Sequence, residues 1–160
     1  MSPNDDILTA QLIDKLKENS WMITTAESCT AGMIMAQLTA VSGSSAVVDR
    51  GFVTYSNQAK SDLLNVQEAT LKLYGAVSAE TAYEMVSGAA EKAGGCAAIA
   101  VTGIAGPDGG SAEKPVGTVW IATSTPAAGV LCKDYLFSGN RHEVRAQTVT
   151  SALVQILSQL

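Results

Sequence analysis

The sequence is poor in several residue types whose abundance would mark a particular class of protein. Its 160 residues include one histidine and three cysteines, only 5% are aromatic and 16% are charged. A disordered chain is rich in charge and poor in aliphatic residues, so the 47% hydrophobic content excludes disorder. No apolar run approaches the roughly 20 residues that a membrane helix needs. The net charge of -5 does not favour general nucleic-acid binding, although a local basic site remains open.

The cysteines and the histidine do not form a metal-binding pattern. Cys29, Cys96 and Cys132 are far apart, and His142 stands alone in the charged stretch RHEVR. We therefore expect reduced, buried thiols and neither a metal nor a cofactor. The N-terminal stretch MSPNDDILTAQ is acidic and lacks the apolar segment of a signal peptide, so we expect a cytoplasmic protein.

Hydrophobic periodicity and turn residues predict an alternation of helices and strands. We expect helices over 5–19, 29–40 and 141–158, a short helix capped by Asn57 and a long helix capped by Ser78. Strands are expected over 21–25, 51–55, 96–101, 118–123 and 130–137, the last two as a hairpin. This order predicts an α/β protein, specifically a three-layer α/β/α sandwich with a mixed sheet. No linker or repeat interrupts the chain, so we predict one domain over 1–160.

The first candidate site is the segment TTAESCTAG, residues 24–32, where a predicted strand passes into a helix. Ser28 would lie near the N–H groups of the first helical turn, which could stabilise an oxyanion, so Ser28 is a candidate nucleophile. The alternative is that Glu27, Ser28 or Thr30 merely caps the helix. The segment is not G-x-S-x-G, so it does not indicate an α/β-hydrolase.

The second candidate site is Tyr55–Lys60, after the next strand. Adjacent parallel strands end at the same edge of a sheet, which would bring Lys60 to Ser28. A lysine can act as the base for a serine when burial lowers its pKa, and His142 has no independent support in that role. The alternatives are that Lys60 is an exposed helical residue and that Tyr55 is an ordinary strand aromatic.

The third candidate site is the glycine-rich segment TGIAGPDGG, residues 102–110. Glycines allow backbone N–H groups to approach an anion closely. The segment matches neither the Walker A pattern nor G-x-G-x-x-G, and an ordinary connecting loop is the alternative. Its length and its place at the same sheet edge favour binding of a ligand.

Four stretches together resemble the nicotinamide-nucleotide amidase family, that of the CinA C-terminal domain and PncC-like proteins: TTAESCTAG, GFVTYSNQAKSDLL, GAVSAET and VTGIAGPDGGSAEKPVGTVWIA. The resemblance extends from about residue 5 to the end of the chain. It implies hydrolysis of nicotinamide mononucleotide to nicotinate mononucleotide and ammonia. It also implies an α/β/α fold with a mixed, mostly parallel five-stranded sheet.

The same resemblance implies roles for individual residues. Ser28 corresponds to the nucleophile, Lys60 to the base and Tyr55 to a third catalytic residue. The substrate-binding positions are Cys29, Thr30, Thr102, Gly103, Gly106, Gly109, Gly110 and Arg145, with Arg141 as an alternative to Arg145. We expect a small nucleotide substrate, no metal or cofactor, no nucleic acid or membrane partner, and a homo-oligomer, namely a dimer. The competing hypotheses are a non-catalytic nucleotide-binding module of the same fold and a hydrolase of a different amide.

Overall fold

Five strands form one sheet in the computed structural model of the protein, which describes residues 2–160. They are β1 (Ile23–Glu27), β2 (Val48–Val53), β3 (Ala97–Gly103), β4 (Thr118–Thr125) and β5 (Gly129–Leu136). Their order across the sheet is β2-β1-β3-β4-β5. β1 is parallel to β2 and β3, whereas β4 is antiparallel to β3 and β5, so only β4 runs against the others. The mixed, mostly parallel five-stranded sheet is thus confirmed.

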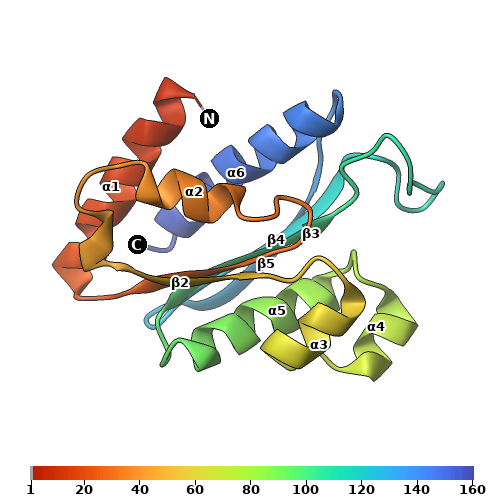
Figure 1. Cartoon of the computed structure of the whole chain (residues 1–160), viewed down its shortest axis with the longest axis horizontal. Helices are drawn as coiled ribbons and strands as arrows, with labels where there is room; N and C mark the ends of the chain where they lie inside the picture. The colour runs from red at the N-terminus through yellow and green to blue at the C-terminus, as the bar shows by residue number, and fades with distance from the viewer. Residues whose placement is uncertain (1) are drawn as a thin grey trace.

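Helices cover both faces of the sheet, as Figure 1 shows. One layer contains α1 (Pro3–Asn19), α2 (Met33–Thr39) and α6 (Arg141–Leu157). The other contains α3 (Asn57–Leu64), α4 (Glu68–Tyr74) and α5 (Ala79–Lys92). A short 3₁₀ helix, η1 (Ser44–Ala46), precedes β2. The predicted three-layer α/β/α sandwich is confirmed. No helix within residues 2–160 is both long enough and apolar enough to cross a membrane.

Several elements differ from the sequence prediction. Helix α4 and the 3₁₀ turn were not predicted, and β1 begins and ends two residues later than expected. Helix α2 begins at Met33 rather than at residue 29, because the chain makes a turn in which Ala31 and Gly32 have φ angles of 50° and 99°. The caps were better predicted: the Ser78 side chain caps α5, but Ser56 rather than Asn57 caps α3.

The sheet brings the three candidate segments to one edge. Glu27, the last residue of β1, is paired in register with Val53 at the end of β2 and with Val101 near the end of β3. Ser28 follows β1 directly, Tyr55 follows β2, and the glycine-rich segment begins with the last two residues of β3. In Figure 1 the chain leaves all three strands at the right-hand end of the sheet.

A close contact between α3 and α5 fixes the height of α3 above the sheet. A Cβ atom built on Gly88 of α5 would lie 2.0 Å from the carbonyl oxygen of Leu64, the last residue of α3. Both residues are buried. Only glycine therefore allows this approach, and α3 is the helix that carries Lys60.

We expect Gly88→Ala to destabilise the protein although alanine is the better helix former by about 1 kcal/mol. Overpacking of a core typically costs about 1–3 kcal/mol, and each kcal/mol lowers the Tm of a protein of this size by about 2–4 °C. Thermal melting monitored by circular dichroism checks this, with Ser87→Ala on the same helix as the control. A Gly88→Ala variant that melts at or above the parent temperature would contradict the contact.

Candidate active site

The side chains of Ser28 and Lys60 meet at the carboxyl end of the sheet. Lys60 Nζ lies 3.0 Å from Ser28 Oγ, and the lysine is only 1% exposed. The amine also lies 2.9 Å from the Thr54 carbonyl oxygen and 3.4 Å from the Tyr55 carbonyl oxygen. Lys60 is therefore not the exposed helical residue that the sequence left as an alternative.

The two carbonyl groups orient the Lys60 amine toward Ser28. A neutral amine has two N–H bonds and one lone pair, whereas an ammonium group has three donors and no acceptor. When the two N–H bonds of the neutral amine point at the Thr54 and Tyr55 carbonyls, the lone pair is left to accept a proton from Ser28 Oγ. This arrangement suits a base that removes the proton of the serine hydroxyl.

Burial lowers the pKa of Lys60, an effect that the neighbouring Cys29 partly opposes. Burial disfavours the charged form of an amine, because water no longer solvates it. No salt bridge to Lys60 occurs within residues 2–160 that would favour the ammonium form again. The site therefore favours the neutral amine more than an exposed position would.

Cys29 does not compete with Ser28 as a nucleophile. Its side chain is 5% exposed, and burial, aided by the nearby Glu27, raises the pKa of the thiol to about 11. The thiolate is the reactive form of cysteine, so a thiol with this pKa is unreactive near neutral pH.

Glu27 performs the capping that the sequence left open among Glu27, Ser28 and Thr30. Glu27 is fully buried, and its Oε2 accepts hydrogen bonds from Thr30 Oγ1 at 2.6 Å, Gly32 N at 2.9 Å and Ile34 N at 3.1 Å. Its Oε1 accepts one from Met35 N at 2.9 Å. These helical N–H groups are thus unavailable as oxyanion donors, contrary to expectation. The Ser28 hydroxyl, in contrast, contacts Lys60 and caps nothing.

Two other backbone N–H groups remain near Ser28. Within residues 2–160, the N–H groups of Cys29 and Thr30 form no hydrogen bond with another residue. Arg145 donates from Nε to the Cys29 carbonyl at 3.0 Å and from Nη2 to the Thr30 carbonyl at 2.9 Å. The C=O and N–H of a trans peptide point in opposite directions, so Arg145 turns the Thr30 N–H away from itself. Thr30 has no accessible surface, so its N–H is covered, whereas Cys29 is 5% exposed, which leaves the Cys29 N–H as the candidate donor.

Arg141 joins the second and third candidate segments. Its Nη1 donates to the Gly106 carbonyl at 2.8 Å and its Nη2 to the Tyr55 hydroxyl at 3.1 Å. Tyr55 is 60% exposed, and the described contacts of its hydroxyl do not include Ser28 or Lys60. Tyr55 thus contacts Lys60 through its backbone carbonyl group, and its side-chain hydroxyl contacts Arg141.

The glycine-rich segment folds back on residues that precede β4. Thr102 is buried and donates to the Ala76 carbonyl at 2.8 Å, and Gly103 ends β3.

Gly106 has a φ of +82°, and a Cβ there would lie 2.5 Å from Val116 Cγ1. Gly109 has a φ of +91° but its Cβ would meet nothing closer than 3.7 Å. Glycine at position 106 therefore allows both the positive φ and the close approach of Val116, whereas glycine at position 109 is required only for the positive φ. Gly110, like Gly106, lies against Val116.

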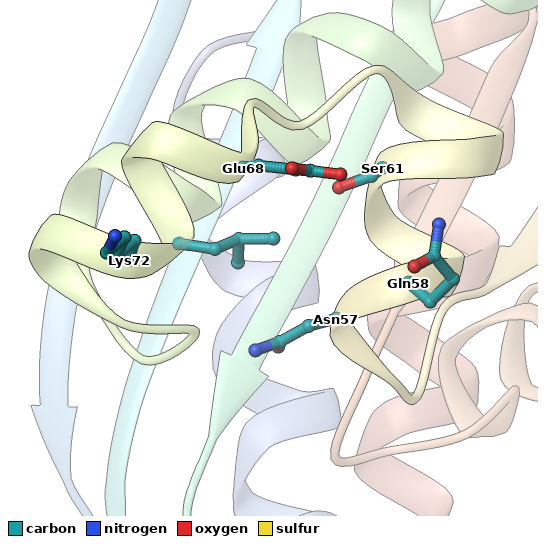
Figure 2. Close-up of a pocket in the computed structure, with 6 residues that line it drawn as sticks. Asn57, Gln58, Ser61, Glu68 and Lys72 are labelled. Atoms are coloured by element: carbon teal, nitrogen blue, oxygen red, sulfur yellow. The ribbon is translucent and has the colours of Figure 1, made fainter.

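A separate pocket lies between α3 and α4, as Figure 2 shows. Its lining residues are Asn57, Gln58, Ser61, Glu68, Leu71 and Lys72. The side chains of Ser61 and Glu68 point toward each other across it. The pocket contains neither Ser28 nor Lys60 and belongs to the outer side of α3.

Comparison with known proteins shows similarity over almost the whole chain. A family model described as the CinA C-terminal domain matches residues 5–160. The nicotinamide-nucleotide amidohydrolase PncC of Enterobacter agglomerans is 49% identical over 152 residues, which cover 95% of this chain and 93% of that protein. PncC of Escherichia coli K12 is 46% identical and covers 95% and 92%. The crystal structure of the competence/damage inducible protein CihA from Agrobacterium tumefaciens has a TM-score of 0.96 at 46% identity, covering 99% of this chain and 96% of that one.

We expect the Lys60 amine to lose its proton at a pH below its ordinary value of 10.5. NMR titration of ¹³C-labelled lysine side chains measures this, with Lys60→Met identifying the signal. Between the folded-state pKa and 10.5 the unfolded chain still holds the proton that the folded protein has lost, so stability rises with pH in that window. The free energy of unfolding of the parent should therefore rise with pH relative to that of Lys60→Met. A difference that does not change with pH would contradict the lowered pKa.

Proposed function

Since the chain belongs to the CinA C-terminal domain family, we propose that it is an amidohydrolase that converts nicotinamide mononucleotide to nicotinate mononucleotide and ammonia. Two relatives that match nearly its whole length are named nicotinamide-nucleotide amidohydrolases. The observation that carries the proposal is the 3.0 Å contact between Ser28 Oγ and the buried Lys60 amine. A nucleophile beside a group that can take its proton is the basic unit of covalent amide hydrolysis.

In the first half of the reaction, neutral Lys60 takes the proton of Ser28 Oγ while the oxygen attacks the carboxamide carbon. The pyridinium ring withdraws electrons and makes this carbon more electrophilic. The Cys29 N–H stabilises the oxyanion of the tetrahedral intermediate. The Lys60 ammonium then protonates the leaving nitrogen, the C–N bond breaks, and ammonia departs from an acyl-enzyme on Ser28.

In the second half, water hydrolyses the acyl-enzyme. Lys60, neutral again, takes a proton from the water as its oxygen attacks the ester carbon. The bond to Ser28 Oγ breaks, and the serine regains its proton from Lys60. Nicotinate mononucleotide leaves as the carboxylate after its acid proton passes to solvent, where the ammonia takes up a proton. The two half-reactions use the same base and the same oxyanion donor, so no metal ion or cofactor enters the scheme.

The phosphate of the substrate is held by the glycine-rich segment and an arginine. Arg145 donates to two carbonyl groups beside Ser28, which favours a role in positioning that turn. Arg141 is exposed and already contacts both Gly106 and Tyr55. We therefore expect Arg141 to bind the phosphate, because its guanidinium suits a charge-assisted contact. The Tyr55 ring, which contacts Arg141, then lies on the substrate side of the site. The homodimer and the lack of a nucleic-acid partner remain predictions from the sequence.

We expect Ser28→Ala to abolish release of ammonia from nicotinamide mononucleotide while the protein stays folded. Loss of a nucleophile lowers kcat by on the order of 10⁴–10⁶-fold in worked cases. Because Ser28 caps no helix, Tm should change little. A coupled ammonia assay and circular dichroism check the two outcomes. A variant that keeps more than about a tenth of the parental rate of ammonia release would exclude Ser28 as the nucleophile.

The parent protein in the same assay separates the competing functions. A binding module would bind the nucleotide, by isothermal titration calorimetry, and release no ammonia. A hydrolase of another amide would release ammonia from a different carboxamide but not from this one.

Gly109→Ala tests whether the glycine-rich segment holds the phosphate. A Cβ at a φ of +91° forces the backbone to move, at a cost of about 1–2 kcal/mol, without meeting a neighbouring group. We expect KM for nicotinamide mononucleotide to rise several-fold, by about the factor that 1–2 kcal/mol represents. KM for the riboside that lacks the phosphate should change little. Steady-state kinetics of both substrates on both proteins form a cycle that isolates this coupling. An equal rise for both substrates would mean that the segment shapes the pocket without holding the phosphate.

A further inference from the structure

Glu27 is a buried carboxylate with no cationic partner in the part of the chain that the structure describes. It has no accessible surface, and no salt bridge within residues 2–160 includes it. Burying a charge costs free energy unless the surroundings provide hydrogen bonds. Here the Thr30 hydroxyl and three backbone N–H groups provide them. All four donors belong to residues 30–35, the turn after Ser28 and the start of α2, so the carboxylate and this turn fix each other.

The turn depends on this carboxylate. Helix α2 has only seven residues and no side-chain cap within the helix itself. Ala31 adopts a φ of 50°, which a non-glycine residue adopts only when its surroundings require it. Without Glu27 the Gly32, Ile34 and Met35 N–H groups would lose their acceptors, and this side of the turn would lose its hydrogen bonds to the last residue of β1.

Arg145 holds the opposite side of the same turn. Arg145 donates hydrogen bonds to the carbonyl groups of Cys29 and Thr30, whereas Glu27 accepts hydrogen bonds from N–H and hydroxyl groups of residues 30–35. Glu27 and Arg145 do not form an ion pair. The peptide that carries the Thr30 N–H is thus held by Arg145 through the Cys29 carbonyl, while Glu27 holds the Thr30 hydroxyl and the N–H groups that follow it.

We propose that Glu27 is a positioning residue for the hydrolysis: through the turn at residues 30–35 it holds Ser28 Oγ against Lys60 and the Cys29 N–H toward the developing oxyanion. This inference rests on the proposed function. It adds a residue that does not touch the substrate and acts on kcat through Ser28. A small displacement of a reacting group from its productive geometry can cost on the order of 10²-fold in rate.

The conservative variants are Glu27→Gln and Thr30→Val. A carboxamide at Glu27 presents an NH₂ group to at least one backbone N–H that now donates to an oxygen, and Thr30→Val removes the hydroxyl donor at nearly constant volume. We expect kcat for nicotinamide mononucleotide to fall by on the order of 10–10²-fold in Glu27→Gln while KM changes by less than about threefold, since the substrate contacts remain. Thr30→Val should show a smaller fall of the same kind.

Gln37→Leu is the matched control. Gln37 is also fully buried on α2, but its amide contacts Asp6 and Thr9 of α1, away from Ser28. It should lower Tm and leave kcat unchanged. If Gln37→Leu loses as much kcat as Glu27→Gln at an equal loss of Tm, or if Glu27→Gln keeps the parental kcat, Glu27 is a structural residue only.

A fluorophosphonate probe tests the proposal independently of the natural substrate. Ser28 Oγ forms a bond to phosphorus, fluoride leaves, and Lys60 takes the serine proton. Mass spectrometry of the labelled peptide gives the rate, which Glu27→Gln should lower by a factor similar to that in kcat and Gln37→Leu should not change. If the parent labels normally but releases no ammonia, the proposed substrate is wrong and the labelling rates decide the role of Glu27. If the parent neither labels at Ser28 nor turns over, both proposals fail.

Discussion

The burial of the Lys60 amine is the constraint on which the rest of the site depends. An amine with 1% exposure must find its hydrogen-bond partners within the protein, and it finds them in Ser28 Oγ and two carbonyl groups that follow β2. This geometry requires the parallel register of β1 and β2, which places Ser28 beside the Thr54–Tyr55 segment. It also requires α3 at a fixed height, which Gly88 permits. The position of the Lys60 amine therefore depends both on the register of the sheet and on the contact between α3 and α5.

The second buried ionisable group of the site, Glu27, forms no ion pair with Lys60. A carboxylate paired with Lys60 would favour the ammonium form and remove the base from the site. Glu27 immediately precedes Ser28, yet its oxygens are occupied by the turn that leads into α2. Burial therefore stays the main influence on the pKa of Lys60. Backbone N–H groups satisfy Glu27 at the same time that they fix the turn after Ser28, so one set of hydrogen bonds has both effects.

The sequence sufficed to predict the layers of the fold. Strand–helix alternation allowed Ser28 and Lys60 to meet at one edge of the sheet but left Lys60 open as an exposed residue, and the family resemblance assigned the two residues to one site. The position of β1 was predicted wrongly: the strand was expected over 21–25 but spans Ile23–Glu27. The hydrophobic pattern favoured the apolar start of that segment, whereas the real strand buries Thr24, Thr25 and Glu27. Polar residues are buried there because the site needs them, and local rules fail at such positions. The contacts of Arg145 with residues more than a hundred positions earlier left no local signal at all.

Helix α6 contacts both the turn after Ser28 and the glycine-rich segment although it is the last element of the chain. Arg141 and Arg145 are four residues apart and so lie on the same face of the helix. Arg145 fixes the carbonyl groups beside Ser28, and Arg141 connects Tyr55 with the glycine-rich segment. A phosphate oxygen is a stronger acceptor for a guanidinium than the neutral carbonyl and hydroxyl that Arg141 now contacts. An incoming phosphate would therefore replace these acceptors without disturbing Arg145, so that a rigid helix holds the nucleophile turn still while the neighbouring arginine exchanges partners.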